Sequence, residues 1–313
     1  MIEATRTVYC YYFPEIRKII NSIVKKYPHN IFLSSIKPGL DNFHIPVIKK
    51  FIKYHKATVP YLKDFKHQYV TGGASEGIFH ILSKLKTENP NLIIYTLKGE
   101  YEGYKEYAKG LGIHIQEVEY QTIPFLTSGI FFISNPSAID GNIISNGIIK
   151  WICTYHRVIY DMTYAGLTEE RKFDVSNKNI LAVVSSLSKP FGIYYHRIGF
   201  TFSREPIETL EGNIWFKNIF SLIIADKIFD IIKPQQLYNK YRPLQEKFVE
   251  GLNLRDELGL RVSDVLLLAN IRARESNNIG RLDKYERGEG YRLCLTPFFL
   301  EAEKLKKWFK KEK

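Results

Sequence analysis

The sequence predicts an α/β fold with a largely parallel sheet, joined to a smaller α+β domain. From about residue 70 to 203, short apolar runs typical of buried strands alternate with runs of helical periodicity. After residue 205 the pattern changes to long helical stretches, which are followed by short strands and a final helix. We therefore expect a large domain at residues 45–208 and a small domain built from residues 1–44 and 209–313.

The elements follow from these patterns in order along the chain. Aliphatic and β-branched runs predict strands at 92–97, 113–119, 130–134, 158–162, 180–185 and 198–202. Helical patterns lie between them, for example at 75–85, 102–111 and 147–156. In the second region we expect helices at 214–232 and 235–252, strands near 265–271 and 291–295, and an amphipathic closing helix.

Composition excludes several classes of protein. The chain has 313 residues with a hydrophobic fraction of 45% and a charged fraction of 25%, which is ordinary for a soluble globular protein. No apolar run is long enough to cross a bilayer, and residues 1–6 carry no signal-peptide pattern. The scattered cysteines Cys10, Cys153 and Cys294 suggest neither a disulfide framework nor a metal site. We expect a cytoplasmic protein with no membrane segment and no bound metal.

The net charge of +12 raises the question of a nucleic-acid partner. The basic tail at 304–311 is interleaved with the apolar residues Leu305, Trp308 and Phe309, as on an amphipathic helix that closes a domain. A basic surface also suits anionic substrates and cofactors that carry phosphate. We therefore expect small-molecule partners and no nucleic acid.

Residues 186–192, with the sequence SLSKPFG, are the most informative stretch. They place Lys189 just past the apolar run 180–185, next to the hydroxyl groups of Ser186 and Ser188, and Arg197 follows eight positions later. An amine held near the apolar interior can act as a nucleophile toward a carbonyl group and form a Schiff base. The alternative is a lysine at a strand end that extends into solvent.

Two further motifs follow predicted strands or open predicted helices. The run 71–77, TGGASEG, opens the helix 75–85, where small residues and free N–H groups suit an anion; the alternative is a helix start capped by Ser75. Tyr101 and Tyr104 follow the strand 92–97, where an aromatic ring can stack on a flat heterocycle or simply pack.

Asp161 ends the apolar strand 158–162 and is followed closely by Tyr164. A carboxylate at this position needs a partner, because burying it alone is costly. A protonated pyridine nitrogen would be such a partner, and Tyr164 could donate to an oxygen on the same ring. The alternative for Asp161 is a helix or turn cap.

These pieces, in this order, resemble the aminotransferase class I and II family of pyridoxal-phosphate enzymes, which have the fold-type I architecture. The resemblance runs from about residue 30 to 296 and is most specific at 186–199, where the pattern S-x-S-K-x-[FL]-G and a later R-x-G are intact. It implies that Lys189 forms the Schiff base with pyridoxal 5'-phosphate and moves the substrate Cα proton. It also implies that family members are mostly homodimers, so we expect a homodimer here.

The resemblance assigns roles to the remaining site residues. Asp161 would keep the pyridine nitrogen protonated, Tyr164 would bond the phenolic oxygen of the ring, and Tyr101 would stack on the ring face. Arg292, within the run 288–294, would grip the substrate α-carboxylate through its planar guanidinium. The phosphate would be held by Gly73, Ala74, Ser75, Ser186 and Arg197.

The sequence departs from the family at two places. In the run 135–141, NPSAIDG, Ala138 stands where the family has a second asparagine that bonds the phenolic oxygen; a shift of one residue to Asn142 is the alternative. The family's substrate loop falls at 33–38, with isoleucine where glycine is expected, and the tyrosine that reaches the neighbouring subunit's phosphate has only Tyr54 and Tyr61 as candidates.

The sequence therefore predicts a pyridoxal-phosphate-dependent aminotransferase that moves an amino group between an L-amino acid and a 2-oxo acid. Two alternatives stay open. The same site could direct decarboxylation, β-elimination or racemisation, since spacing does not show which Cα bond is held perpendicular to the ring. The chain could also be a catalytically weakened member of the fold that serves as a binding or regulatory protein.

Overall fold

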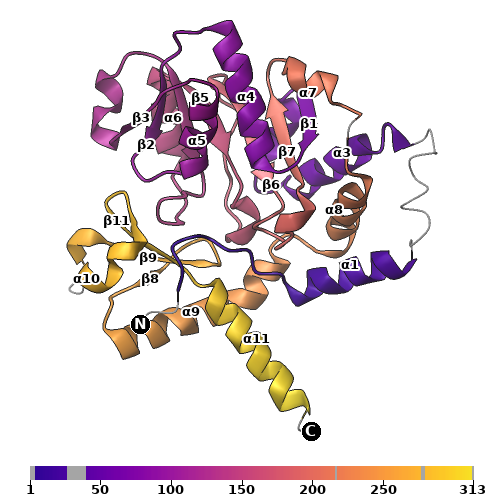
Figure 1. Cartoon of the computed structure of the whole chain (residues 1–313), viewed down its shortest axis with the longest axis vertical. Helices are drawn as coiled ribbons and strands as arrows, with labels where there is room; N and C mark the ends of the chain where they lie inside the picture. The colour runs from indigo at the N-terminus through magenta and orange to yellow at the C-terminus, as the bar shows by residue number, and fades with distance from the viewer. Residues whose placement is uncertain (1–3, 27–39, 216, 276–278, 312–313) are drawn as a thin grey trace.

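The computed structural model describes residues 4–26, 40–215, 217–275 and 279–311. Its centre is a seven-stranded sheet of order β1-β7-β6-β5-β4-β2-β3 (Figure 1). β7 runs antiparallel to both of its neighbours, β1 and β6, and the other strand pairs are parallel. The strands are β1 (His67–Thr71), β2 (Ile94–Leu97), β3 (Ile115–Val118), β4 (Ile130–Ser134), β5 (Arg157–Asp161), β6 (Ile180–Ser186) and β7 (Gly199–Ser203).

Helices cover both faces of this sheet. α4 (Ala74–Glu88) and α5 (Glu102–Gly110) pack on one face, with α7 (Glu208–Gly212) beside them. α3 (His44–Tyr54) and α6 (Asn146–Tyr155) cover the other. Because both faces are covered, the central strands are apolar throughout rather than alternating, and every residue of β4 is buried.

The last part of the chain builds a second, antiparallel sheet of order β10-β11-β9-β8. Its strands are β8 (Arg261–Val262), β9 (Leu268–Arg272), β10 (Glu286–Arg287) and β11 (Gly290–Cys294). The helices of this region are α8 (Ile219–Ile231), α9 (Gln236–Asp256), α10 (Ile279–Leu282) and α11 (Thr296–Lys311). In Figure 1 this sheet lies below the large one, and α11 extends away from the body.

The first residues of the chain join the two regions. Thr5 pairs with Cys294 of β11 through two backbone hydrogen bonds, of 3.2 and 2.8 Å. The segment that follows runs between the large sheet and the small one before α1 (Pro14–Lys26), which packs on α8 (Figure 1).

The predicted fold class is confirmed, and the six strands predicted for the large domain and the two predicted for the small one are found within a few residues of their expected bounds. The helix expected at 214–232 is found as α8, but it begins only at Ile219, after a break that follows the short helix α7, which ends at Gly212. The break is fixed by Asn218, whose side-chain oxygen accepts a hydrogen bond from Ser221 N–H and caps α8. β1, α1 and α3 were not predicted. The division at residues 44 and 208 stays a prediction.

Candidate active site

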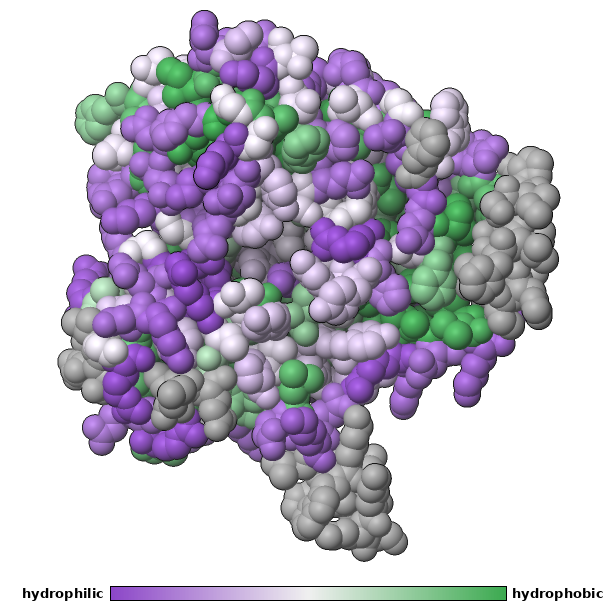
Figure 2. Space-filling view, viewed as in Figure 1, coloured by the Kyte–Doolittle hydropathy of each residue, from purple (hydrophilic) through white to green (hydrophobic). Residues whose placement is uncertain are grey.

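A cavity of about 620 Å³ opens where β4, β5 and β6 end, and the surface is hollowed there (Figure 2). The carboxyl edge of a parallel sheet is where α/β proteins gather ligands, and the volume suits a small molecule. The predicted residues that line it are Ala74, Ser75, Tyr101, Asp161, Tyr164, Ser186, Lys189 and Arg197. Gly73 lies directly beside the lining at the start of α4, and Arg292 is not among the lining residues.

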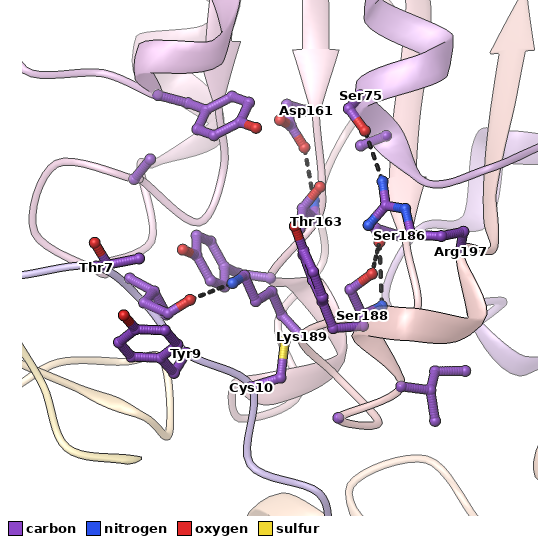
Figure 3. Close-up of a pocket in the computed structure, with 18 of the residues that line it drawn as sticks. Thr7, Tyr9, Cys10, Ser75, Asp161, Thr163, Ser186, Ser188, Lys189 and Arg197 are labelled. Carbon is purple, nitrogen blue, oxygen red and sulfur yellow. Dashed lines mark hydrogen bonds between the residues drawn. The ribbon is translucent and has the colours of Figure 1, made fainter. Parts of the chain in front are cut away.

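One wall of the cavity is built to hold an anion. Arg197 Nη2 donates to Ser75 Oγ at 2.8 Å at the N-terminus of α4, and the hydroxyls of Ser186 and Ser188 are 2.9 Å apart (Figure 3). Gly73 has a φ of +102°, and a Cβ built there would lie 2.7 Å from Arg197 Nη2. Only glycine fits, so the arginine can come close to the helix start.

Asp161 lies at the end of β5 with its carboxylate buried in the floor of the cavity. Its Oδ2 accepts from Tyr104 O–H at 3.0 Å and its Oδ1 accepts from Thr163 N–H at 2.9 Å. Burial raises the pKa of Asp161, and these hydrogen bonds act against that rise. Among the described residues, no cationic side chain pairs with this carboxylate, so a cation in the cavity would stabilise it.

The Lys189 side chain extends into the cavity, where its Nζ donates to the carbonyl oxygen of Val8 (Figure 3). The same Nζ lies 5.9 Å from the ring centroid of Tyr194. Cys10 lies beside it; burial raises the pKa of the Cys10 thiol, and the charge of Lys189 acts in the opposite direction. The amine therefore lies in the lining of the cavity, against the N-terminal segment.

The N-terminal segment forms another wall, which the sequence reasoning missed. Its contributors to the lining are Thr7, Val8, Tyr9, Cys10 and Tyr12. Gly192, within the motif around Lys189, has a φ of +71°, and a Cβ there would collide with the carbonyl of Tyr11. The glycine is needed for this close approach of two backbones, and it is the one signal in the sequence that could have pointed to the segment.

The two tyrosines assigned to the cofactor ring differ in exposure. Tyr101 is 40% exposed and meets the Tyr104 ring edge-on at 5.4 Å, so one of its faces is available for stacking. Tyr164 is buried, and its burial raises the pKa of the hydroxyl to about 12. Its hydroxyl therefore keeps its proton at neutral pH and can donate it in a hydrogen bond.

Arg292 lies behind the wall that Ala138 forms. Its Nη1 donates to the carbonyl of Ala138 and its Nη2 donates to that of Arg6 at 3.2 Å, while its buried Nε has no partner. The guanidinium is thus near the cavity but bonded to backbone oxygens rather than facing into the cavity.

The remaining candidates from the sequence are Asn142, Tyr54, Tyr61 and the loop at 33–38. Asn142 bonds Asp140 and Asp264 and does not line the cavity, so it does not replace the missing asparagine. Tyr54 O–H donates to the Lys233 carbonyl at 3.3 Å, while Tyr61 is 41% exposed. The loop at 33–38 lies outside the described residues.

These walls fit the cofactor that the sequence suggested. The glycine cradle with Arg197 and the serine hydroxyls suits a phosphate, the buried Asp161 suits a protonated pyridine nitrogen, and Lys189 suits an aldehyde carbon. The described residues hold no cluster of side chains that could bind a metal ion, and no helix among them is long and apolar enough to cross a membrane.

Comparison with known proteins identifies the family of the chain. The family model described as "Aminotransferase class I and II" matches residues 34–221, which is more than half of the chain. A search of curated protein sequences gave no significant match.

Solved structures of several activities share the fold. They include L-threonine-O-3-phosphate decarboxylase from Porphyromonas gingivalis (TM-score 0.65, 14% identity, 98% of each chain covered). Histidinol-phosphate aminotransferase from Sinorhizobium meliloti, in complex with pyridoxal-5'-phosphate, has a TM-score of 0.68 at 11% identity, with 93% of this chain and 85% of that one covered. A pyridoxal-phosphate-bound C-S lyase from Staphylococcus hominis has a TM-score of 0.70 at 10% identity, with 94% and 84% covered.

At such identities the structures show a common fold but not a common reaction. The family is set by the model match and by the motifs around Lys189 and Asp161. The chain belongs to the aminotransferase class I and II family of pyridoxal-phosphate-dependent enzymes, and its cofactor is pyridoxal phosphate.

Proposed function

We propose that the chain is an aminotransferase that moves an amino group between an L-amino acid and a 2-oxo acid. The observation that carries the proposal is the position of Lys189, whose side chain lines the same cavity as those of Asp161 and Arg197. Transamination needs one amine that can take a proton from the substrate and return it at a nearby atom.

The bound cofactor would supply an electron sink for the bonds at the substrate Cα. Arg197 and Ser75 would hold its phosphate and so fix the orientation of its ring. Asp161 would hold the proton of the pyridine nitrogen, and Tyr164 would donate to the phenolic oxygen. The Nζ of Lys189 would take the Cα proton, hold it and deliver it to the cofactor carbon, while the N-terminal segment would limit the entry of water.

A lyase or decarboxylase reaction is the second candidate, and the position of Arg292 favours it. Its Nη atoms donate to backbone carbonyls of Ala138 and Arg6. If the substrate carboxylate binds elsewhere, a different Cα bond would be aligned for cleavage. A C-S lyase and a decarboxylase share this fold, so the fold is compatible with either outcome.

The test is a half-reaction. The protein loaded with pyridoxal phosphate is mixed with single L-amino acids without any oxo acid, and its visible spectrum and products are followed. Conversion of the cofactor to the amine form with release of a 2-oxo acid supports transamination. Release of carbon dioxide, ammonia or thiol without that conversion supports the lyase reaction. If neither occurs with any amino acid, both are wrong and the weakened binding protein is the remaining candidate.

We also propose that the protein is a cytoplasmic homodimer that uses small-molecule substrates. The homodimer rests on the family, and the absence of any disulfide among Cys10, Cys153 and Cys294 is in keeping with a reducing compartment. Light scattering on a size-exclusion column checks the assembly, where a mass of one chain would contradict it.

A further inference from the structure

The wall that lacks the family's asparagine contains a polar pair instead. Ser134 is the last residue of β4, pairs in register with Asp161 of β5 and lines the cavity beside Ala138. Behind it lies Glu100, which follows β2 and is 3% exposed. A buried carboxyl group that contacts a cavity-lining hydroxyl can change what that hydroxyl offers to a ligand.

The contacts of this pair are closely spaced. Ser134 Oγ lies 2.8 Å from Oε1 and 2.7 Å from Oε2 of Glu100, and it accepts from Ala138 N–H at 2.6 Å. Oε1 also accepts from Ser134 N–H and Oε2 accepts from Tyr101 N–H, both at 3.1 Å. The Ser134 hydroxyl thus connects Glu100, which directly precedes Tyr101, with Ala138, which stands where the family has an asparagine.

A serine hydroxyl has only one hydrogen to donate. When Glu100 is ionised it has no hydrogen of its own, so the Ser134 hydroxyl must donate to it. When Glu100 is protonated, its O–H can donate to Ser134 Oγ. The Ser134 hydrogen is then free to be donated to an acceptor in the cavity, so the proton on Glu100 decides which way Ser134 donates.

The burial of Glu100 places this change near neutral pH. Burial raises the pKa of Glu100 to about 7, its hydrogen bonds act against the rise, and the charge of Asp161 adds to it. The other groups that face it are the hydroxyls of Tyr104 and Tyr120 and the guanidinium of Arg287, which donates to the Glu100 carbonyl at 3.0 Å.

We propose that Ser134, under the control of the proton on Glu100, is the hydrogen-bond donor that this chain presents to the cofactor ring in place of the family's asparagine. An acceptor on the ring would then be bonded more strongly when Glu100 is protonated. The inference depends on cofactor binding by this cavity and goes beyond the proposed function, because it does not depend on which substrate bond breaks.

The test measures the dissociation constant of pyridoxal phosphate, and the midpoint of its absorption change with pH, from pH 6 to pH 8. The native protein should bind the cofactor about three- to tenfold more weakly at pH 8 than at pH 6, which is the factor expected for one hydrogen bond. Any pH dependence of the affinity that comes from other groups adds to this factor. Glu100→Gln, whose amide can always donate to Ser134, should lose that factor and bind at pH 8 as tightly as at pH 6. Glu106→Gln, an exposed glutamate of the neighbouring helix α5, is the matched control and should behave as the native protein does.

A second pair of variants tests the hydroxyl itself. Ser134→Ala should bind the cofactor at pH 6 as weakly as the native protein does at pH 8, and adding Ala138→Asn should restore the affinity. Unchanged pH dependence in Glu100→Gln, or native affinity at pH 6 in Ser134→Ala, would overturn the inference. An enzyme with the expected binding pattern but no amino transfer would overturn the proposed function and leave the role of Ser134 standing.

Discussion

Two walls of the same cavity contrast in how closely they follow the family. The first, which we call the phosphate wall, consists of Gly73, Ser75, Ser186 and Arg197; its members keep the family pattern, and Arg197 is held in place by Ser75. The second, which we call the ring wall, consists of Ser134 and Ala138, which line the cavity, and of Glu100 and Arg292, which lie behind them. There the usual asparagine is absent, and the arginine bonds backbone oxygens.

The difference teaches where this chain can vary. A phosphate needs several donors in one geometry, so the phosphate wall tolerates few replacements. A hydrogen bond to the ring needs one donor, which different residues can supply. We therefore expect substitutions in the phosphate wall to weaken cofactor binding at every pH, and those in the ring wall to affect substrate binding and the pH dependence of cofactor binding.

The largest effect should come from Lys189, which lies between the two walls. Lys189→Ala removes the amine that bonds the cofactor and moves the proton, so we expect a loss of activity of about a thousandfold or more. The measurement is turnover together with cofactor retention after reduction with borohydride and gel filtration. Lys178→Ala, an exposed lysine, should match the native protein. Retained activity in Lys189→Ala would refute the assignment of the catalytic lysine.

Arg292→Lys tests the ring wall. If Arg292 binds the substrate carboxylate, loss of the planar fork should raise KM by about 10- to 100-fold while cofactor affinity stays near native. Arg272→Lys, at the exposed end of the neighbouring strand β9, is the control. A lowered Tm with an unchanged KM would show instead that Arg292 only ties Ala138 to the N-terminal segment.

Gly73→Ala tests the phosphate wall. The added Cβ would meet Arg197 Nη2, and the residue would have to keep a φ of +102°. We expect cofactor affinity to fall by about tenfold and the free energy of unfolding to fall by about 1–3 kcal/mol. Gly110→Ala is the control, because nothing lies within 4 Å of its added Cβ and its φ is not positive. Native affinity in Gly73→Ala would mean that the cradle does not hold the phosphate.

The smallest effect we predict is on the stability of the cofactor-free protein. Burial raises the pKa of Glu100 to about 7, above the value in the unfolded chain, so ionising it costs stability. That cost is absent at pH values well below the pKa of Glu100 in the unfolded chain. It grows as the pH rises from that pKa to the pKa in the folded protein, and it is complete above pH 7. Glu100→Gln should therefore gain several °C in Tm relative to the native protein at pH 8 and little at pH 5. An equal gain at both pH values would contradict a buried, titrating carboxyl group.

The sequence predicted those residues of the site that belong to recognisable sequence motifs. Asp161 ends one apolar strand, Lys189 follows another, and Arg197 precedes a third. The ends of parallel strands meet at one edge of a sheet, so these residues were expected to lie close together. The α/β class followed from the same alternation of strands and helices. β1 was missed because only part of the segment His67–Thr71 is buried, so its pattern is less apolar than that of β4.

The parts that escaped prediction depend on contacts between distant segments. Nothing in residues 7–12 marks them as a cavity wall, since their placement follows from pairing with β11. The pair of Glu100 and Ser134 likewise joins the loop after β2 to the end of β4, and in the sequence a lone glutamate or serine predicts only an exposed residue.

The contacts of residues 5–9 with the last part of the chain have a consequence for the order in which the protein folds. The Thr296 hydroxyl donates to the carbonyl of Tyr9, across 287 residues of chain, at 2.8 Å. During synthesis the first residues leave the ribosome long before β11 does, so the large sheet can form while the cavity still lacks one wall. Cofactor binding should therefore be completed late in folding, once residues 5–9 have paired with β11 and Thr296.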